Sequence, residues 1–533
     1  MSDTVDAHNL QGVSPDESEN EHLLRDDEGA APLLSFSLTG VPNLDTILGG
    51  GIPKGALTLM MGAPGSGKTS LASQIAFGAA HNGQRILVLT ALSESTNKLI
   101  EHLRNFAFFD SEVIGREMQF FSLQSVLSQG LVQTRGEILR MVRQTRANML
   151  MMDGFRGIRE IEGDASAARQ FLYEIGTGLG ALRITTLITS ETDPHDPTFF
   201  PETTTADVIL GLHYHLLGAR QTRAIEVIKA RGVAPLPGLH ALTLNSFGCH
   251  VYPQLEERVA LEAQARSSLS EKVVGGGIAA ISTSPSSAPS NRTAQTGGEA
   301  EHSITFGLPH LDAMMRGGVG PTTSTVVAGS LGSGKTLIAL HFALAGARTG
   351  APSIYLSFRE DAEQLLRVVK PFAIGAEIQE RLQPGGGMTI LWAPPIKLQP
   401  DIIAEQLLTH LDAVGPCRLV VDGIVELERA IARSADPGRL EDYLAALVQA
   451  LRHRQVTPLF VVETGTLVTA TLDFSADPLS ILAENIMSLR QVIANGKVRR
   501  ILTLLKMRYS TYDTSVREFV IAPPDGIRVL GSL

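Results

Sequence analysis

Two glycine-rich segments that end in Lys-Thr stand 267 residues apart in the chain (329 − 62). The first runs from Gly62 to Thr69 and the second from Gly329 to Thr336. Both match the pattern GxxxxGK(S/T), in which successive backbone N–H groups surround phosphate oxygens and the Lys reaches the β- and γ-phosphates. Because both matches follow an apolar run and share the same offset, the sequence predicts a duplicated nucleotide-binding unit.

Each loop supplies the same set of predicted ligands. The backbone and the Lys bind phosphates, and the Thr hydroxyl completes the site as a Mg²⁺ ligand, so the predicted cofactors are ATP and Mg²⁺. The predicted nucleotide-binding residues are Gly62, Gly65, Ser66, Gly67, Lys68, Thr69 and Ser70 in the first loop, and Gly329, Gly332, Ser333, Gly334, Lys335, Thr336 and Leu337 in the second.

A carboxylate ends an apolar run behind each loop. Asp153 follows Met149–Met152, 85 residues beyond the first loop Lys (153 − 68), and Asp422 follows Leu419–Val421, 87 residues beyond the second (422 − 335). A Mg·nucleotide site needs such a carboxylate at the end of a neighbouring strand to hold the metal. Thr69 with Asp153, and Thr336 with Asp422, are therefore the predicted metal-binding pairs.

The segments that must position these residues also repeat. Gly40–Asp45 corresponds to Gly307–Asp312 at the same offset of 267 residues (307 − 40). After each loop we expect a helix whose N-terminus faces the phosphates, over 70–80 and 337–348. The expected strands are Arg85–Thr90, Asn148–Met152 and Thr185–Ser190 in the first half, and Ser353–Ser357, Arg418–Val421 and Pro458–Val462 in the second. This alternation predicts an α/β fold, with two tandem domains that each hold a mostly parallel sheet between helices.

The chain of 533 residues is too long for a single core. Residues 1–33 are polar and acidic and are predicted to be a disordered tail. Residues 34–256 form the first predicted domain and residues 303–533 the second. Residues 257–302 begin with an Ala/Glu/Arg-rich stretch compatible with a helix and continue into a Gly- and Ser/Pro/Thr-rich run, so they are predicted to be a flexible linker.

The composition excludes several classes of protein. A net charge of −10 argues against a dedicated duplex-DNA binder. The two cysteines, Cys249 and Cys417, are too few for a disulfide framework or a Cys-based zinc site. The N-terminus is acidic instead of resembling a secretory signal, and no stretch approaches the roughly 20 apolar residues that span a membrane. We therefore expect a soluble, cytoplasmic protein without membrane contact.

ATP hydrolysis needs a group that orients or deprotonates the attacking water. Glu94 and Glu360, which follow Ser93 and Arg359, stand 26 (94 − 68) and 25 (360 − 335) residues beyond the loop Lys and are the candidates. With these motifs, the chain resembles the KaiC family of RecA-type ATPases in its double-domain form. The resemblance runs from about residue 36 to 256 and from about 303 to the C-terminus. It rests on the segment Gly40–Gly51, the loops, the strand-end Asp residues and a basic strand near the end of each half.

That basic strand carries Lys229 and Arg231 in the first half and Lys506 and Arg508 in the second. Alternation puts both charges on one face of a strand, a pattern that solvated strands also show. The resemblance implies more: in KaiC-like hexamers this pair reaches the γ-phosphate bound to the adjacent subunit and neutralises charge in the transition state. It therefore implies catalytic roles for these four residues and a homo-oligomer, a hexameric ring, with nucleotide at the subunit interfaces.

The chain departs from the family pattern near the predicted catalytic residues. KaiC-like domains commonly carry two adjacent Glu residues where this chain has Ser93-Glu94 and Arg359-Glu360. The first Glu is the one credited with activating water, so we expect slow hydrolysis, with Glu94 or Glu360 as a substitute. The second domain is expected to bind ATP more than it hydrolyses it. Glu191 and Glu463 each end a later strand. Two interpretations stay open: they contact this region, or they are simply solvated at the strand end.

Ser480 is the predicted phosphoacceptor. The clock members of the family phosphorylate an adjacent Ser-Thr pair on their second domain, and the alignment puts Ser480-Ile481 there. The resemblance thus implies Ser/Thr autokinase activity at Ser480, although an exposed loop Ser explains the residue more simply.

Two alternative functions stay open. The first is a non-clock, nucleotide-gated signalling switch that hydrolyses little ATP and presents ring surfaces to signalling proteins of unknown identity; Ser93 and Arg359 favour it. The second is a recombinase-like ATPase on single-stranded DNA, which needs a basic loop and an aromatic platform. Its candidates are Tyr214-His215 and the segment Arg490–Arg500 with Lys497 and Arg499, and overall we do not expect a nucleic-acid partner.

Overall fold

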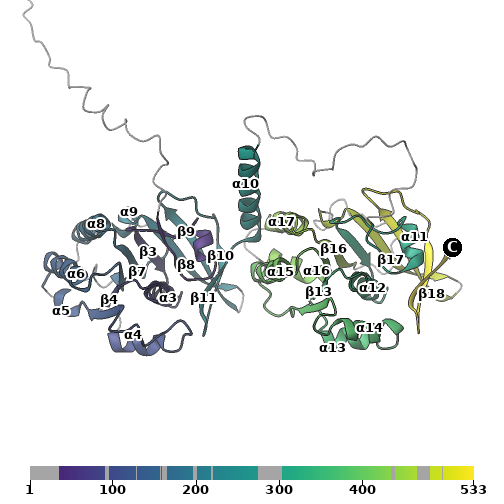
Figure 1. Ribbon diagram of the computed structural model, residues 1–533, viewed down its shortest axis with the longest axis horizontal. Coiled ribbons are helices and arrows are strands. Elements are labelled where there is room, and N and C mark those ends of the chain that lie inside the picture. The colour runs from purple at the N-terminus through teal and green to yellow at the C-terminus, as the bar shows by residue number, and fades with distance from the viewer. Residues whose placement is uncertain are drawn as a thin grey trace, which may run out of the picture.

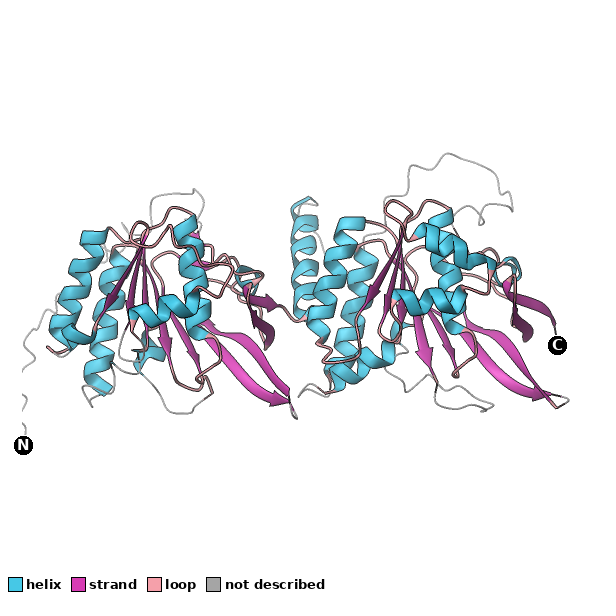
Figure 2. Ribbon diagram, turned by 90° about the horizontal axis from the view of Figure 1, so that it is seen from below, coloured by secondary structure: helices cyan, strands magenta, loops and turns pink. Residues whose placement is uncertain are grey.

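The computed structural model describes residues 35–90, 95–127, 129–155, 158, 165–195, 201–217, 220–273, 303–433, 438–464, 481–494 and 496–532. These residues form two units of the same architecture that lie side by side along the long direction of the molecule (Figure 1). Each unit contains a nine-stranded sheet with helices on both faces (Figure 2).

The first sheet has the strand order β11-β10-β9-β8-β3-β7-β6-β4-β5. The strands from β5 to β8 are parallel, and β9, β10 and β11 continue the sheet antiparallel at one edge. The strands are Leu57–Gly62 (β3), Ile86–Thr90 (β4), Met118–Ser122 (β5), Met149–Asp153 (β6), Thr185–Ser190 (β7), Val208–Leu217 (β8), Arg220–Ala230 (β9), His240–Asn245 (β10) and Gly248–Tyr252 (β11), with the small pair Phe36–Ser37 (β1) and Ile52–Pro53 (β2) beside them. The helices are Leu44–Ile47 (α2), Lys68–His81 (α3), Thr96–Leu103 (α4), Gln124–Leu127 (α5), Leu131–Thr145 (α6), Ala165–Ala181 (α8), Pro201–Thr205 (α9) and Leu255–Val273 (α10).

The second sheet repeats this order as β20-β19-β18-β17-β12-β16-β15-β13-β14. Its strands are Thr325–Gly329 (β12), Ser353–Ser357 (β13), Met388–Trp392 (β14), Arg418–Asp422 (β15), Thr457–Glu463 (β16), Asn485–Ala494 (β17), Lys497–Lys506 (β18), Arg517–Ala522 (β19) and Gly526–Ser532 (β20). Its helices are Pro309–Met314 (α11), Lys335–Arg348 (α12), Ala362–Val369 (α13), Ala373–Arg381 (α14), Pro400–Val414 (α15), Ile424–Ala432 (α16) and Arg439–His453 (α17). The predicted fold class, two tandem α/β domains, is confirmed, and the ends of the predicted strands and helices shift by two residues at most.

The central strand β3 shows why each sheet carries helices on both faces. Leu57, Leu59 and Met61 belong to one buried cluster and Met60 to another, because successive side chains of a strand point to opposite faces. A parallel strand that is apolar on both faces must be covered on both. The long helix α3 lies in the cluster with Met60, and α6 and α8 lie in the other.

The helix α10, which follows the first domain, packs against helices of the second. Its residues Leu255 and Val259 are buried in the same cluster as residues of α15 and α17, and Figure 1 shows α10 standing beside α17. Arg439 of α17 donates a 2.6 Å hydrogen bond to Glu256 of α10. Residues 257–273 therefore continue the helix α10 instead of forming a flexible linker, and the first turns of this helix pack on the second domain. Residues 274–302 lie outside the described residues.

No helix in the described ranges is both long enough and apolar enough to cross a bilayer.

His341, in the middle of α12, makes the second domain sensitive to acid. It is 5% exposed, and neither ring nitrogen has a hydrogen-bond partner among the described residues. Burial, with a smaller contribution from Arg348, lowers the pKa of His341 to about 4. An unfolded His titrates near about 6.5, so the unfolded chain takes up this proton first and stability is lost as the pH falls below that value.

We expect the free energy of unfolding of the second domain to fall by about 2 kcal/mol between roughly pH 7 and pH 5 because of this one group. Calorimetry at both pH values measures it. The matched variant is His341→Gln, since Gln74 occupies the same position of α3. The variant should lose this part of the pH dependence, and an equal acid shift in parent and variant would contradict the assignment.

Candidate functional site

The first phosphate loop lies at the carboxyl edge of the sheet, between the end of β3 and the start of α3. Gly65 and Gly67 have φ of +81° and +105°, a region that residues with a Cβ rarely adopt. A Cβ on Gly62 would stand 2.3 Å from the carbonyl oxygen of Leu212 on β8. Sterics thus require glycine at these positions, and the loop places its amides at the N-terminus of α3.

Lys68 is held over this loop. Its Nζ donates hydrogen bonds of 2.9 Å and 3.0 Å to the carbonyl oxygens of Gly62 and Ala63. Burial lowers the pKa of Lys68, while Glu191 and Asp153 offset part of that effect. The ammonium group is therefore positioned where an arriving anion meets both the loop amides and a positive charge.

The predicted metal pair of the first domain is in direct contact. Thr69 Oγ1 donates a 2.9 Å hydrogen bond to Asp153 Oδ1. Thr189 of β7 donates to the same oxygen at 2.6 Å and accepts from the N–H of Gly154 at 2.9 Å. A cavity of about 400 Å³ opens here, lined by Pro64, Gly65, Gly67, Lys68, Thr69, Ser70, His102, Asp153, Gly154, Thr189, Glu191 and Leu244. A hydroxyl beside a carboxylate at a helix N-terminus fits a Mg·phosphate group.

The second loop repeats this geometry. Lys335 Nζ donates to the carbonyl oxygens of Gly329 and Ser330 at 2.9 Å and 2.8 Å. Thr336 Oγ1 donates to Asp422 Oδ2 at 3.1 Å. The other predicted loop residues, Ser66, Gly332, Ser333, Gly334 and Leu337, lie in the same turn and first helical residues of their domains. The hydroxyls of the buried Ser66 and Ser333 have no partner within the described parts of the chain.

The two carboxylates are held by different neighbours. Tyr355, fully buried on β13, donates a 2.6 Å hydrogen bond to Asp422 Oδ2. Burial raises the pKa of Asp422, and the hydrogen bonds from Tyr355 and Thr336 lower it in part. By strand position Val88 replaces Tyr355 in the first domain, where Thr189 holds the Asp instead. Sequence reasoning missed both Tyr355 and Thr189, because only the strand register brings them to the carboxylate.

Arg359 forms an ion-pair cluster at the edge of the second site. Its Nε donates to Glu426 Oε1 at 2.7 Å, and its NH1 pairs with Glu463 at the end of β16. The hydrogen bond from Arg359 lowers the pKa of Glu463. Beside this cluster, burial and then the charge of Asp422 raise the pKa of Glu360. The predicted base of the second domain therefore stands between Arg359 and the carboxylate of Asp422.

The predicted basic pairs lie at the other end of their sheets. Lys229 donates to the carbonyl oxygen of Thr203 at 3.4 Å, and Arg231 pairs with Asp207 at 3.4 Å. The N–H of Asp207 in turn donates to the carbonyl of Leu57 at the start of β3. Five residues of strand, or about 17 Å, separate this level from Gly62, so the structure does not bring the pair to its own phosphate loop.

In the second domain Lys506 donates to the carbonyl of Ala483 at 2.9 Å, and Arg508 lies 3.8 Å from Glu484. This is again the start of the central strand, since Glu484 accepts from the N–H of Ser324 at 3.0 Å. The prediction that Lys and Arg share one strand face is wrong: β9 ends at Ala230 and β18 ends at Lys506, so each Arg follows its strand.

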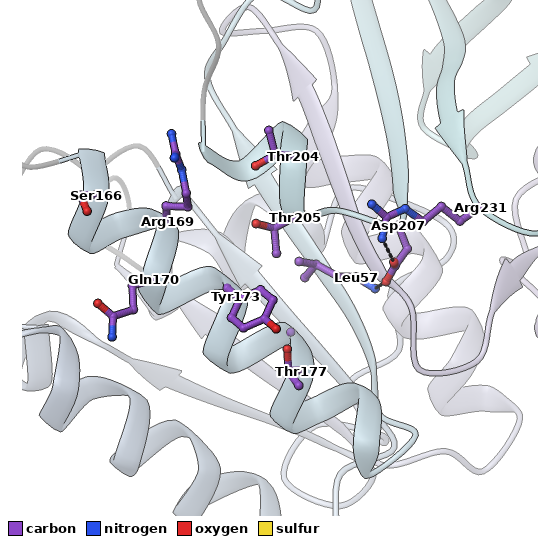
Figure 3. A pocket seen from close by; sticks show the side chains of 11 residues that line it. Leu57, Ser166, Arg169, Gln170, Tyr173, Thr177, Thr204, Thr205, Asp207 and Arg231 are labelled. Atoms are coloured by element: carbon purple, nitrogen blue, oxygen red, sulfur yellow. Dashed lines mark hydrogen bonds and ion pairs between the residues drawn. The ribbon is translucent and has the colours of Figure 1, made fainter. Parts of the chain in front are cut away.

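A hollow of about 570 Å³ opens beside Arg231, larger than the cavity at the first loop. Figure 3 shows Arg231 and Asp207 on one side of it and Tyr173 of α8 on the other. The Arg231 side chain is 60% exposed. The first domain therefore has concave surfaces at both ends of its sheet, one at the phosphate loop and one at the basic pair.

Several residues near the candidate surface for single-stranded DNA make contacts within the protein itself. Arg499 pairs with Glu518 at 2.9 Å, and Arg500 donates to the carbonyl of Gly332 at 3.3 Å. The guanidinium of Arg223 lies 4.9 Å from the ring centroid of Tyr214. In the described residues, Arg499 and Arg500 are thus engaged by groups of their own domain.

Glu94 and Ser480 lie outside the described residues. Their predicted roles, as a catalytic base and as a phosphoacceptor, stay predictions.

Two mostly parallel nine-stranded sheets, each with a phosphate loop after its central strand and an Asp at the end of a neighbouring strand, define a tandem P-loop protein of RecA-like architecture. A family model described as "ATPase: KaiC" matches residues 37–256 and 304–533. The chain therefore belongs to the KaiC ATPase family.

Relatives that cover most of the chain carry the same family name. The circadian clock oscillator protein KaiC of Parathermosynechococcus lividus is 23% identical over 495 residues, which covers 91% of this chain and 83% of that protein. The circadian clock protein KaiC3 of Synechocystis sp. is 24% identical over 497 residues, which covers 91% of this chain and 89% of that protein.

The hydrogen bond from Tyr355 predicts how Mg²⁺ dependence responds to pH. Tyr355→Phe removes a donor that favours the ionised form of Asp422, so the pKa of that carboxyl rises further. We expect Mg·ATP affinity at the second site to fall by about tenfold at pH 6 and less at pH 8. Titration with a fluorescent ATP analogue, in a chain whose first loop carries Lys68→Ala, measures it.

Thr189→Val is the matched change for the first site. It should alter the Mg²⁺ dependence of that site and leave the second unchanged. An unaltered pH dependence in Tyr355→Phe would show that the hydrogen bond does not control Asp422.

Proposed function

We propose that the protein binds Mg·ATP at both phosphate loops and hydrolyses it slowly as a homo-oligomeric ring of six chains. Lys229 and Arg231, and Lys506 and Arg508, complete the nucleotide site of the neighbouring chain. Family membership supports the ATPase activity, and the geometry of each half supports the sites.

ATP binding is supported by the convergence of donors at the carboxyl edge of each sheet. The loop amides and Lys68, or Lys335, take the β- and γ-phosphates, with the N-terminal dipole of the following helix behind them. Thr69 with Asp153, and Thr336 with Asp422, hold Mg²⁺. The metal when bound neutralises phosphate charge that the single Lys leaves uncompensated.

The observation that carries the ring is the position of the basic pairs. They lie at the amino-terminal edge of the sheet, about 17 Å of strand from the loop of their own domain, and the side chains of Arg231 and Arg508 are exposed there. A charge that acts on the γ-phosphate must come within hydrogen-bond reach of it, so these residues cannot act on the nucleotide of their own domain and are proposed to act on that of a neighbouring chain. A head-to-tail interface of this kind generates a closed ring when its rotation permits.

The two sites are proposed to be unequal. In the second domain Arg359 places a positive charge, paired with Glu426 and Glu463, where the family pattern has a carboxylate. Glu360 is half-buried beside Asp422, which weakens its tendency to lose a proton. The second site therefore retains ATP longer than the first. This asymmetry also favours the second candidate function, in which ATP held by the second domain is a signalling state read by partner proteins.

Removal of one basic residue should reduce turnover without reducing binding. We expect Arg231→Ala to lower ATP turnover by at least about tenfold, since a residue of this kind contributes roughly 10³–10⁵ in related enzymes. The control is Arg85→Ala, because Arg85 is an exposed arginine that precedes β4 at the same end of the sheet. Light scattering with and without Mg·ATP measures the number of chains in the assembly. A monomer under both conditions, together with unchanged ATP turnover in Arg231→Ala, would contradict the proposal.

Separate removal of the two loop lysines should show the inequality. We expect Lys68→Ala to abolish most of the turnover, whereas Lys335→Ala keeps most of it and mainly loses bound nucleotide. Rates per chain, together with the ATP/ADP content of the isolated protein, give both quantities. Equal losses of turnover in the two variants would show that Arg359 does not slow the second site.

A further inference from the structure

A group of two histidines and a glutamate lies in the first domain, outside the predicted nucleotide ligands. Among the residues that the structure describes, His195, His213 and Glu226 are the one set of His, Cys, Asp or Glu whose ligand atoms all lie within 4.8 Å of one another. Glu226 Oε1 is 2.8 Å from His213 Nε2 and 3.1 Å from His195 Nε2.

The three side chains come from three segments that the fold brings together. His213 lies on β8, Glu226 on β9, and His195 on the turn that follows β7. The residue opposite Glu226 in the β8–β9 pair is Gly211, and a Cβ there would stand 3.0 Å from the Glu226 carboxylate. The glycine thus provides the space in which Glu226 reaches His213, two residues further along the same strand face.

The geometry points to a metal site. We propose that His195, His213 and Glu226 bind a divalent transition-metal ion of the Zn²⁺ class. Metal–ligand bonds of about 2.0–2.1 Å in a tetrahedral site put neighbouring ligand atoms about 3.3 Å apart, close to the observed 2.8 Å and 3.1 Å. Two imidazoles and one carboxylate suit Zn²⁺, Co²⁺ or Ni²⁺, whereas Mg²⁺ prefers oxygen ligands.

Two of the proposed ligands are largely buried and the third is exposed, as a preformed site that an ion can enter requires. The side chain of His213 is 4% exposed and that of Glu226 is 17% exposed, so both are fixed by packing before an ion arrives. The His195 side chain is 67% exposed and provides the entry path. Three protein ligands leave a fourth position for water.

The second domain lacks the same ligands at the matching positions. The register that pairs Gly211 with Glu226 pairs Ser488 with Thr503 in β17 and β18. Arg490 therefore stands where β8 has His213, and a guanidinium has no lone pair to donate to a metal. Within the part of the chain that the structure describes, such a ligand set occurs in the first domain and not in the second, which adds a further difference between the two duplicated units.

The site also adjoins the first phosphate loop. Arg223, on the same strand as Glu226, donates a 3.3 Å hydrogen bond to the carbonyl of Gly65. The turn that carries His195 follows β7, which provides Thr189 to the predicted Mg²⁺ site. An ion at the proposed site thus ties together the two segments that flank this loop.

Cobalt binding tests the proposal directly. The full, untagged, nucleotide-free chain is titrated with Co²⁺ in excess Mg²⁺, which occupies oxygen-rich sites, and the visible absorption of tetrahedral Co²⁺ is recorded. We expect one Co²⁺ per chain, displaced by one equivalent of Zn²⁺. His195→Ala and Glu226→Gln should each weaken binding by at least about thirtyfold, since even outer-shell changes cost about 10–100-fold at metal sites.

His215→Ala is the matched control, because the His215 ring stacks on His213 at 5.3 Å but is not in the ligand set. Its affinity should stay within about threefold of the parent. Circular dichroism checks folding, and His195→Ala removes only an exposed side chain, so loss of binding there does not reflect unfolding. The proposal is overturned if the parent binds no more Co²⁺ than His195→Ala, or if His215→Ala weakens binding as much as His195→Ala.

Discussion

The contact between a loop threonine and a strand-end aspartate is the constraint on which each half of the molecule depends. Thr69 meets Asp153, and Thr336 meets Asp422, only if the loop strand and the Asp strand are parallel and lie on either side of one intervening strand. The apolar runs of both strands then need helices on both faces. The sheet order, the two cores and the position of the helix N-terminus all follow from holding these two groups together.

Each sheet separates its functional groups between its two ends. Phosphate loops and carboxylates gather at the carboxyl edge, and the basic pairs lie at the amino edge, with the hollow beside Arg231. A single chain thus has its predicted nucleotide site at one edge of the sheet and its basic pair at the other. This polarity makes assembly part of the proposed chemistry, because strand length alone keeps the two groups of one domain apart.

The sequence predicted the local features well and the register-dependent ones poorly. Loops and strand-end aspartates are contiguous patterns with fixed spacing, so they could be identified before the fold was known. Thr189 and Tyr355 hold the carboxylates across strands, and no spacing signals them. The same holds for His195, His213 and Glu226, which meet only through the β8–β9 pairing and the β7 turn. Composition alone also misjudged 257–273, since this segment continues the helix α10, whose residues Leu255 and Val259 are buried with residues of α15 and α17.

Mixing two inactive chains tests the central claim most directly, with Lys335→Ala in both so that only the first site reports. One chain also carries Lys68→Ala, which keeps Arg231, and the other carries Arg231→Ala, which keeps the loop. If each site is completed by the neighbouring chain, co-assembly in Mg·ATP restores ATP turnover well above that of either chain alone. Turnover that stays at the sum of the separate chains, in mixtures shown by native mass spectrometry to contain both, would contradict the account.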